Sequence, residues 1–226
     1  MKYQNHKIAT FINRPNRFIA EIEIDSKRAI CHVKNTGRLK ELLISGVQVL
    51  VEESDNPTRK TVYDLIAVQK GKDFINIDSQ APNKIAAEWL PESGLFPAET
   101  IFKHEVKCGN SRFDFCAKTS NETVWIEVKG ITLNDNGIAR FPDAPTERGV
   151  KHLKELTEIV EKGGSAMVLF VVQMKGITAV APNDKTHPQF GDALRAAAKA
   201  GVQIVAVDCI VKPGEVYADS MLPILL

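Results

Sequence analysis

The sequence predicts two domains, a small all-β barrel or sandwich followed by a mixed α/β domain. Short segments that alternate between apolar and polar residues fill the chain up to about residue 80, and longer helical patterns begin at Asn83. The charge balance changes at the same place. Lys and Arg exceed Asp and Glu by 13 to 10 before residue 83, and number 16 against 18 from there on. A length of 226 residues is enough for two domains.

The first domain, residues 1–82, contains six short strand-like segments and no long helical pattern. Turn residues separate these segments at close spacing, which is typical of a small antiparallel barrel or sandwich. We expect its strands at 7–12, 17–25, 29–34, 47–52, 61–68 and 74–77.

The second domain, residues 83–226, begins with a helix over 83–89 for which Asn83 is the expected cap. Further helices are expected over 146–162, ending at two glycines, and over 192–200. The apolar run from Ala166 to Val172 fits a strand covered on both faces, so we expect a mixed central sheet. Its strands are expected at 101–107, 111–117, 123–131, 166–174, 177–180 and 202–207.

Composition excludes several classes of protein. The net charge of +1 argues against a uniformly basic surface, and the longest apolar run is far shorter than the ~20 residues of a membrane-spanning helix. The N-terminus does not resemble a signal peptide, so we expect a cytoplasmic protein with no membrane partner. Four dispersed cysteines argue against zinc, and the sequence contains no glycine-rich motif for dinucleotide or P-loop chemistry.

Three neighbouring strands are expected to carry acidic side chains on one face. A tight turn at Gly109-Asn110 would place Glu105 opposite Asp114, and a second turn within residues 118–122 would place Asp114 opposite Glu127. Because strand side chains alternate, these three carboxylates would share a face with Arg112 and Lys129, and the other face would be apolar.

This row of carboxylates predicts a metal site. Like charges directly opposite each other destabilise a sheet, and Mg²⁺ or Mn²⁺ would compensate them through the oxygen ligands that these ions prefer. We expect Glu105, Asp114 and Glu127 to bind the metal. Glu88 and the carbonyl of Val128 are further candidate ligands.

Asp114, Glu127 and Lys129 form the candidate catalytic set. Lys129 would hold an attacking water or stabilise the negative charge that develops on a phosphate. The alternative interpretation is a solvated sheet face without chemistry, because an Asp followed at a distance by Glu-x-Lys is common by chance.

The same residues resemble a known nuclease motif. Asp114 and Glu127-Val-Lys129 are similar to PD-(D/E)XK, and nearly the whole chain resembles the sugar fermentation stimulation protein A (SfsA) family. The resemblance implies an N-terminal OB-like barrel, a PD-(D/E)XK nuclease-like α/β domain, and DNA binding. The stretches that carry it are Arg17-Phe-Ile-Ala20, His32-Val-Lys-Asn-Thr-Gly-Arg38, Arg59-Lys-Thr61, Gly109-Asn-Ser-Arg-Phe-Asp-Phe115, Glu127-Val-Lys-Gly-Ile-Thr-Leu133, Phe141-Pro-Asp-Ala144 and Arg148-Gly-Val-Lys-His-Leu153.

Basic residues around the barrel and beside the acidic strands form the candidate nucleic-acid-binding set. Phosphate contacts by such residues give affinity that is independent of base sequence and sensitive to salt. On the helix after Thr146, Arg148 and His152 lie one turn apart and would face the carboxylates. The alternative is an ordinary solvated surface. The set comprises Arg14, Arg17, Lys34, Arg38, Arg112, Arg148 and His152.

Two hypotheses of function follow. The first is a DNA-binding protein without strong sequence preference whose second domain is a Mg²⁺-dependent phosphodiesterase, with a homodimer as one candidate assembly. The second is a non-catalytic DNA-binding regulator of sugar metabolism that uses the nuclease fold. A third idea, an enzyme acting on a sugar phosphate, rests on the family name alone.

Overall fold

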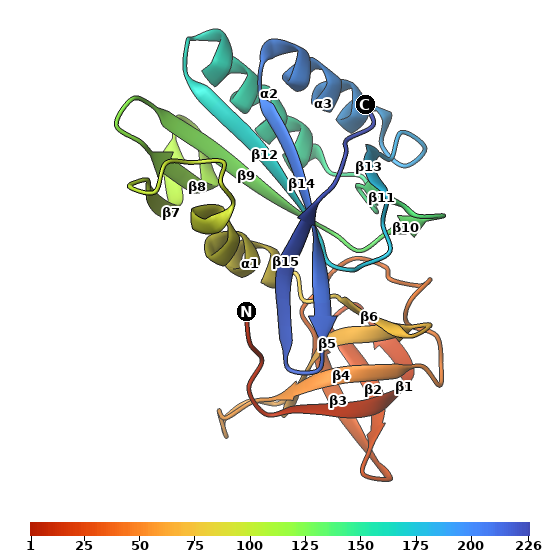
Figure 1. The fold of residues 1–226 in the computed structure, drawn as a ribbon. Helices are drawn as coiled ribbons and strands as arrows, with labels where there is room; N and C mark the ends of the chain where they lie inside the picture. The colour runs from red at the N-terminus through yellow and green to blue at the C-terminus, as the bar shows by residue number, and fades with distance from the viewer.

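A closed barrel forms the N-terminal domain of the computed structural model, which describes all 226 residues (Figure 1). Its sheet has the order β3-β2-β1-β4-β5-β6, and a parallel pairing of β3 with β5 closes β1–β5 into a five-stranded barrel. The predicted OB-like domain is therefore confirmed. The strands are β1 (His6–Asn16), β2 (Ile19–Ile24), β3 (Lys27–Val33), β4 (Gln48–Glu53), β5 (Tyr63–Lys70) and β6 (Asp73–Asn76).

The second domain is built on a six-stranded sheet of order β15-β14-β12-β9-β8-β7. Strand β12 pairs in parallel with β9 and β14, and the other pairs are antiparallel, so the predicted mixed central sheet is confirmed. The strands are β7 (Ile101–Cys108), β8 (Ser111–Lys118), β9 (Thr123–Ile131), β12 (Ser165–Val172), β14 (Gln203–Lys212) and β15 (Glu215–Met221).

Helices cover both faces of this sheet: α1 (Ala81–Trp89) lies on one, and α2 (Glu147–Glu161) and α3 (Pro188–Ala200) on the other (Figure 1). A short 3-10 helix, η1 (Leu90–Glu92), follows α1. Alternate residues of β12 contribute to two separate cores, Met167 and Leu169 on the α1 side and Val168 and Phe170 on the α2 side. This two-sided burial explains the unbroken apolar run of the strand.

Two predicted helix starts were wrong. Helix α1 begins at Ala81 rather than at Asn83, and α3 begins at Pro188 rather than near Asp192. Both helices carry a proline in the first turn, where the missing N–H costs no hydrogen bond. Asn83 lies within the helix, and its side chain bonds to the sheet instead of capping the helix.

Strand β15 and two further strands were not predicted from the sequence. The two further strands, β10 (Asn134–Asp135) and β11 (Ile138–Phe141), form a small third sheet with β13 (Ala179–Pro182), which corresponds to the strand expected at 177–180. Strand β15 forms a hairpin with β14 that reaches down to the barrel (Figure 1). At the turn of that hairpin, the Tyr3 N–H donates to the carbonyl of Gly214 at 2.8 Å, so the N-terminal segment runs along the second domain.

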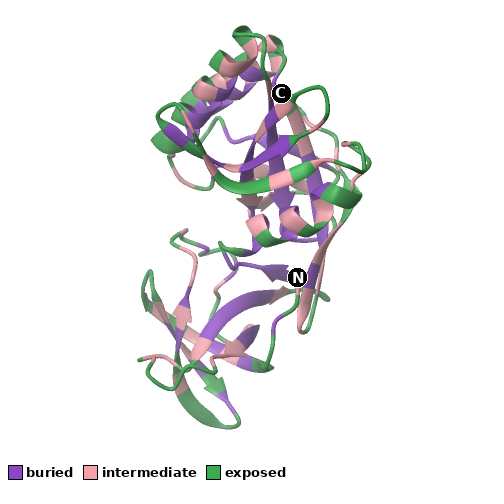
Figure 2. Cartoon of the chain, turned by 90° about the vertical axis from the view of Figure 1, so that its left-hand side faces the viewer, coloured by how far each residue is buried: buried purple, intermediate pink, exposed green.

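The two domains share their apolar cores. Leu50 and Ile66 of the barrel belong to the same buried cluster as Ile85 of α1 and Phe115 of β8. Figure 2 shows buried residues continuing through the central sheet and the inside of the barrel. None of the helices combines the length and apolar character that crossing a membrane requires.

Candidate functional site

The predicted strand registers around the acidic residues are correct. His104 lies opposite Phe115 and Val106 opposite Phe113, as the turn at Gly109-Asn110 requires. Phe115 in turn lies opposite Ile126 in the pairing of β8 with β9. The two turns therefore set the alignment of β7, β8 and β9.

The ladder changes at Asp114 itself. Pairing of β8 with β9 ends at Phe115 and Ile126, one residue short of Asp114 and Glu127. The Asp114 carboxylate fills the gap: Oδ2 accepts the backbone N–H of Val128 at 2.8 Å, and Oδ1 accepts the Asn83 side-chain amide at 2.8 Å. Asp114 therefore lies between α1 and the part of the sheet where β8 and β9 no longer pair.

Glu105 does not join this group, so the predicted row of three carboxylates was wrong. Glu105 adopts a left-handed backbone conformation with φ of 49°, which breaks the alternation of side chains in β7. Its side chain is 69% exposed and pairs with Arg112 at 3.4 Å. No group of three or more His, Cys, Asp or Glu side chains is arranged to hold a metal ion.

Glu127 is the most enclosed acid of the site, with only 4% of its surface exposed. Its Oε1 atom accepts hydrogen bonds from the Lys129 ammonium and from the His152 ring. Its Oε2 atom is buried and has no hydrogen-bond partner. Lys129 reaches the same oxygen because residues two apart on a strand share a face.

The two carboxylates have opposite pKa shifts. Burial, followed by the charge of Glu127, raises the pKa of Asp114 above its usual value. Burial also tends to raise the pKa of Glu127, but hydrogen bonds and charge from His152 and Lys129 outweigh it, and the net pKa is lowered. Pairs of acids whose pKa values are pushed apart are typical of sites that perform proton or metal chemistry.

This donor set fits a hard divalent cation. Asp114 and Glu127 supply carboxylate oxygens. Lys129 and His152 contact only Oε1 of Glu127, which leaves Oε2 buried without a hydrogen-bond partner. Glu88, the further candidate ligand, is exposed and pairs with the N-terminal ammonium instead. Among the candidate acids, only Asp114 and Glu127 are therefore placed to hold such an ion.

His152 and Arg148 have different positions. His152 is buried, its ring packs against Phe113 with centroids 5.9 Å apart, and it bonds to Glu127. Arg148 is exposed and donates from Nε to His152 Nε2 at 3.4 Å, which leaves Nδ1 to donate to Glu127. His152 is thus placed to orient Glu127, and Arg148 keeps donors that face solvent.

Two of the basic residues predicted to bind nucleic acid instead form hydrogen bonds or ion pairs within the protein. The Arg14 guanidinium donates to four backbone carbonyls, those of Arg17, Asn35, Gly37 and Arg38, at 2.6–3.0 Å. Lys34 pairs with the buried acids Asp64 and Asp78 at 3.0 and 3.8 Å. The sequence could not show these internal partners. Arg17 and Arg38 are exposed, as is Arg112.

Family models cover both domains. The model described as the SfsA N-terminal OB domain matches residues 12–77, and the one described as the sugar fermentation stimulation protein RE domain matches residues 80–215. The chain belongs to the SfsA family.

Other SfsA proteins are similar over the full chain. Sugar fermentation stimulation protein homologues from Ruminiclostridium cellulolyticum and Clostridium beijerinckii are 53% and 50% identical to it, with 100% of both chains covered in each comparison. The structure of Pyrococcus furiosus SfsA in complex with Ca²⁺ matches with a TM-score of 0.88 at 28% identity. That match covers 100% of this chain and 98% of the other.

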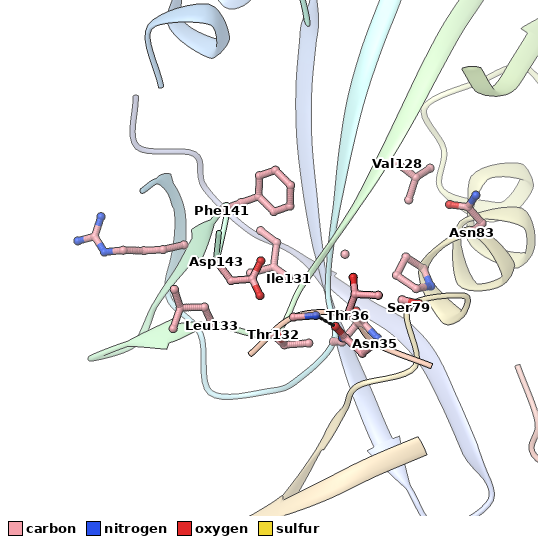
Figure 3. Close-up of a pocket in the computed structure, with 15 residues that line it drawn as sticks. Asn35, Thr36, Ser79, Asn83, Val128, Ile131, Thr132, Leu133, Phe141 and Asp143 are labelled. Carbon is pink, nitrogen blue, oxygen red and sulfur yellow. Dashed lines mark hydrogen bonds between the residues drawn. The ribbon is translucent and has the colours of Figure 1, made fainter. Parts of the chain in front are cut away.

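The structure of this SfsA chain also shows site residues that the sequence analysis missed. A cleft of about 210 Å³ lies between the barrel and the central sheet, and Asn83 and Val128 on its wall are the two residues that bond Asp114 (Figure 3). The remaining lining residues come from the barrel loop after β3, from the start of α1 and the segment before it, from β9 and β11 with the segments that follow them, and from the segment after β12. No sequence spacing links these segments. They include Asn35, Thr36, Thr132, Asp143 and Gln173.

Proposed function

We propose that this SfsA chain binds nucleic acid and cleaves phosphodiester bonds with a divalent metal at Asp114 and Glu127. The observation that carries the proposal is the buried, unpartnered Oε2 of Glu127, in a site where Lys129 and Asp114 converge. A buried carboxylate oxygen without a partner is costly, and a cation beside it removes that cost.

Mg²⁺ or Mn²⁺ is the proposed ion. The similar SfsA protein from Pyrococcus furiosus is described as a complex with Ca²⁺, which, like Mg²⁺, prefers oxygen ligands. When bound, the ion would polarise a phosphoryl oxygen and neutralise the charge that develops during cleavage.

The surrounding side chains supply position and charge. His152 orients the Glu127 carboxylate through Nδ1, and Arg148 fixes the other ring nitrogen of His152. The Lys129 ammonium lies against Glu127 and is placed to hold an attacking water or to stabilise a phosphate oxyanion. The exposed guanidinium of Arg148 would contact a neighbouring phosphate.

Nucleic acid would reach the site along the barrel. Arg17 and Arg38 are exposed there, and Arg112 is exposed on β8. Contacts from these three residues to phosphates would give affinity for DNA that depends on salt and little on base sequence. DNA or RNA is the substrate class that this arrangement fits.

A cleavage assay tests the proposal. Purified protein is incubated with single- and double-stranded DNA and RNA in Mg²⁺ or Mn²⁺, beside the Lys129→Ala and Lys162→Ala variants. Lys162 is an exposed lysine just after α2 and serves as the control. We expect Lys129→Ala to lose about 100-fold or more in rate and Lys162→Ala to retain it. Wild-type cleavage no faster than that of Lys129→Ala contradicts the proposal.

A non-catalytic DNA-binding regulator is the second candidate function. The observation that favours it is that only two acids meet at the site, and no group of three or more His, Cys, Asp or Glu side chains is arranged to hold a metal ion. This alternative predicts DNA binding that weakens steeply with salt, together with no metal-dependent cleavage by the wild-type protein.

A further inference from the structure

The cleft between the barrel and the central sheet adjoins the candidate active site. Asn83 and Val128 line it, and both donate hydrogen bonds to Asp114. Figure 3 shows residues of the barrel loop, Asn35 and Thr36, on one side of the cleft and Phe141 and Asp143 on another. A ligand in this cleft therefore lies directly beside the acids of the site.

The cleft offers free hydrogen-bond acceptors. The Asn83 side-chain amide donates one N–H to Asp114, and its carbonyl oxygen is left for a ligand. Gln173, 98% buried, has committed its amide to Asn76 Oδ1 and to the Asp78 carbonyl, at 2.6 and 3.0 Å, and its Oε1 is likewise left free. Thr132 is nine-tenths buried and also lines the cleft.

Asp143 adds a negative charge to these acceptors. Its carboxylate forms no ion pair and lies so close to the barrel loop that a Cβ on Gly37 would be 2.6 Å from Oδ2. The single basic residue on the lining, Arg140, has its Nε bonded to Asp135 at 2.7 Å and its Nη1 near the Pro182 carbonyl at 3.4 Å. The cleft therefore repels phosphate and attracts N–H donors.

The walls leave room for a narrow ligand. Arg14 holds the barrel loop in place through the carbonyls of Asn35, Gly37 and Arg38. On β9, a Cβ at Gly130 would come within 2.6 Å of Gln173 Oε1, so glycine is what leaves that oxygen accessible. A volume of about 210 Å³ between these fixed walls suits one flat heterocycle and excludes a base-paired duplex.

We infer that the cleft binds one unpaired nucleobase with an exocyclic amino group, from the nucleotide beside the phosphate at the active site. The amino groups of cytosine, adenine and guanine present N–H donors, whereas thymine has no amino group. The inference rests on the proposed function, because it takes the ligand to be part of a nucleic-acid strand. It assigns the chain a preference for single strands that contain cytosine, adenine or guanine over strands of thymine alone.

Binding in EDTA tests this inference without any cleavage. Fluorescent dC8, dA8 and dT8 are titrated into the wild-type protein and into the Asp143→Asn, Thr132→Val and Glu161→Gln variants. Glu161 is an exposed acid at the end of α2, and its variant removes one negative charge outside the cleft. We expect wild type to bind dC8 and dA8 about tenfold more tightly than dT8, and Asp143→Asn to lose that preference.

Amide NMR spectra with dCMP, dTMP, inorganic phosphate and glucose complete the test. Shifts at Gly130 and Thr132 with dCMP, and none with phosphate or glucose, support the inference. Equal binding of all three oligonucleotides, an unchanged preference in Asp143→Asn, or cleft shifts with glucose overturns it. Metal-dependent cleavage without a base preference contradicts this inference but supports the proposed function. A base preference without cleavage supports the inference but contradicts the proposed phosphodiesterase activity.

Discussion

At the scale of single residues, the partners of Glu127 determine the charge state and position of its carboxylate. Its Oε1 is bonded to both Lys129 and His152, while Oε2 faces the interior alone. Neighbouring positive charge and hydrogen bonds keep this carboxylate ionised despite burial, which the lowered pKa of Glu127 reflects. The spacing Glu-x-Lys accounts for Lys129, because both side chains lie on one face of β9.

Removal of the His152 ring nitrogens tests this arrangement. In the absence of metal, we expect His152→Phe to lower the free energy of unfolding by about 1–3 kcal/mol, since a buried carboxylate loses a donor while the volume of the ring is kept. Urea denaturation in EDTA measures the change. Arg148→Ala, at the exposed neighbour of the same ring, should change stability by less than about 0.5 kcal/mol. Equal effects of both substitutions would argue against a positioning role for His152.

At the scale of elements, the barrel depends on the closure between β3 and β5. These strands pair in parallel through Cys31 with Tyr63, His32 with Asp64 and Val33 with Leu65. The Asp64 carboxylate is 4% exposed and binds Arg59 and Lys34 as well as the His32 ring. Ion pairing thus fastens the two strands at the place where the barrel closes.

Acid should weaken this closure. Although burial opposes the change, Arg59 and Lys34 lower the pKa of Asp64 from 3.8 to about 2. A lowered pKa in the folded state contributes stability above pH 4 that is lost as the pH falls from about 4 to about 2. We expect Asp64→Asn to be less stable than wild type by roughly 2 kcal/mol at pH 7. We also expect its stability to fall less steeply than that of wild type as the pH is lowered from about 4 to about 2. Thermal denaturation between pH 2 and 7 measures both effects.

Asp73→Asn provides the control for this prediction, because Asp73 is an exposed acid on β6 outside the closure. Its stability profile should follow that of the wild type across the pH range. If the stability of Asp64→Asn falls as steeply as that of wild type below about pH 4, other carboxylates govern acid unfolding.

At the scale of the whole molecule, a buried polar network joins the two domains. Asn76 donates to the Tyr3 hydroxyl at 2.8 Å, Tyr3 donates to Asp78 at 3.3 Å, and Gln173 of the second domain donates to Asn76 at 2.6 Å. Burial and the charge of Asp78 raise the pKa of Tyr3, so its hydroxyl stays protonated and remains a donor. The shared apolar cores surround this network. The cleft between the domains therefore has walls fixed relative to each other.

The two domains should consequently unfold together. We expect Tyr3→Ala to lower the free energy of unfolding by about 3–5 kcal/mol, and to do so equally for both domains. Fluorescence of Trp89 and Trp125 reports on the second domain, and hydrogen exchange at the β5 amides reports on the barrel. The exposed Phe18→Ala serves as the control and should change stability little. Separate transitions for the two probes would show that the domains fold independently.

The sequence by itself determined the barrel strands, most elements of the second domain and the alignment of the acidic strands, but not β10, β11 or β15. Alternation and turn residues are local signals, and they placed the barrel strands, the two-sided strand β12 and the registers of β7, β8 and β9. The spacing of Asp114, Glu127 and Lys129 along those strands brought three site residues together.

Only the tertiary structure decided which other side chains join them. The left-handed turn of the backbone at Glu105 removes that acid, and contacts over long sequence separations bring Asn83 to Asp114 and His152 to Glu127. Arg14 likewise proved to hold a loop through carbonyls far away in the chain. Local patterns record the direction of a side chain on its own element. Its partners depend on how the elements pack, and no spacing rule contains that information.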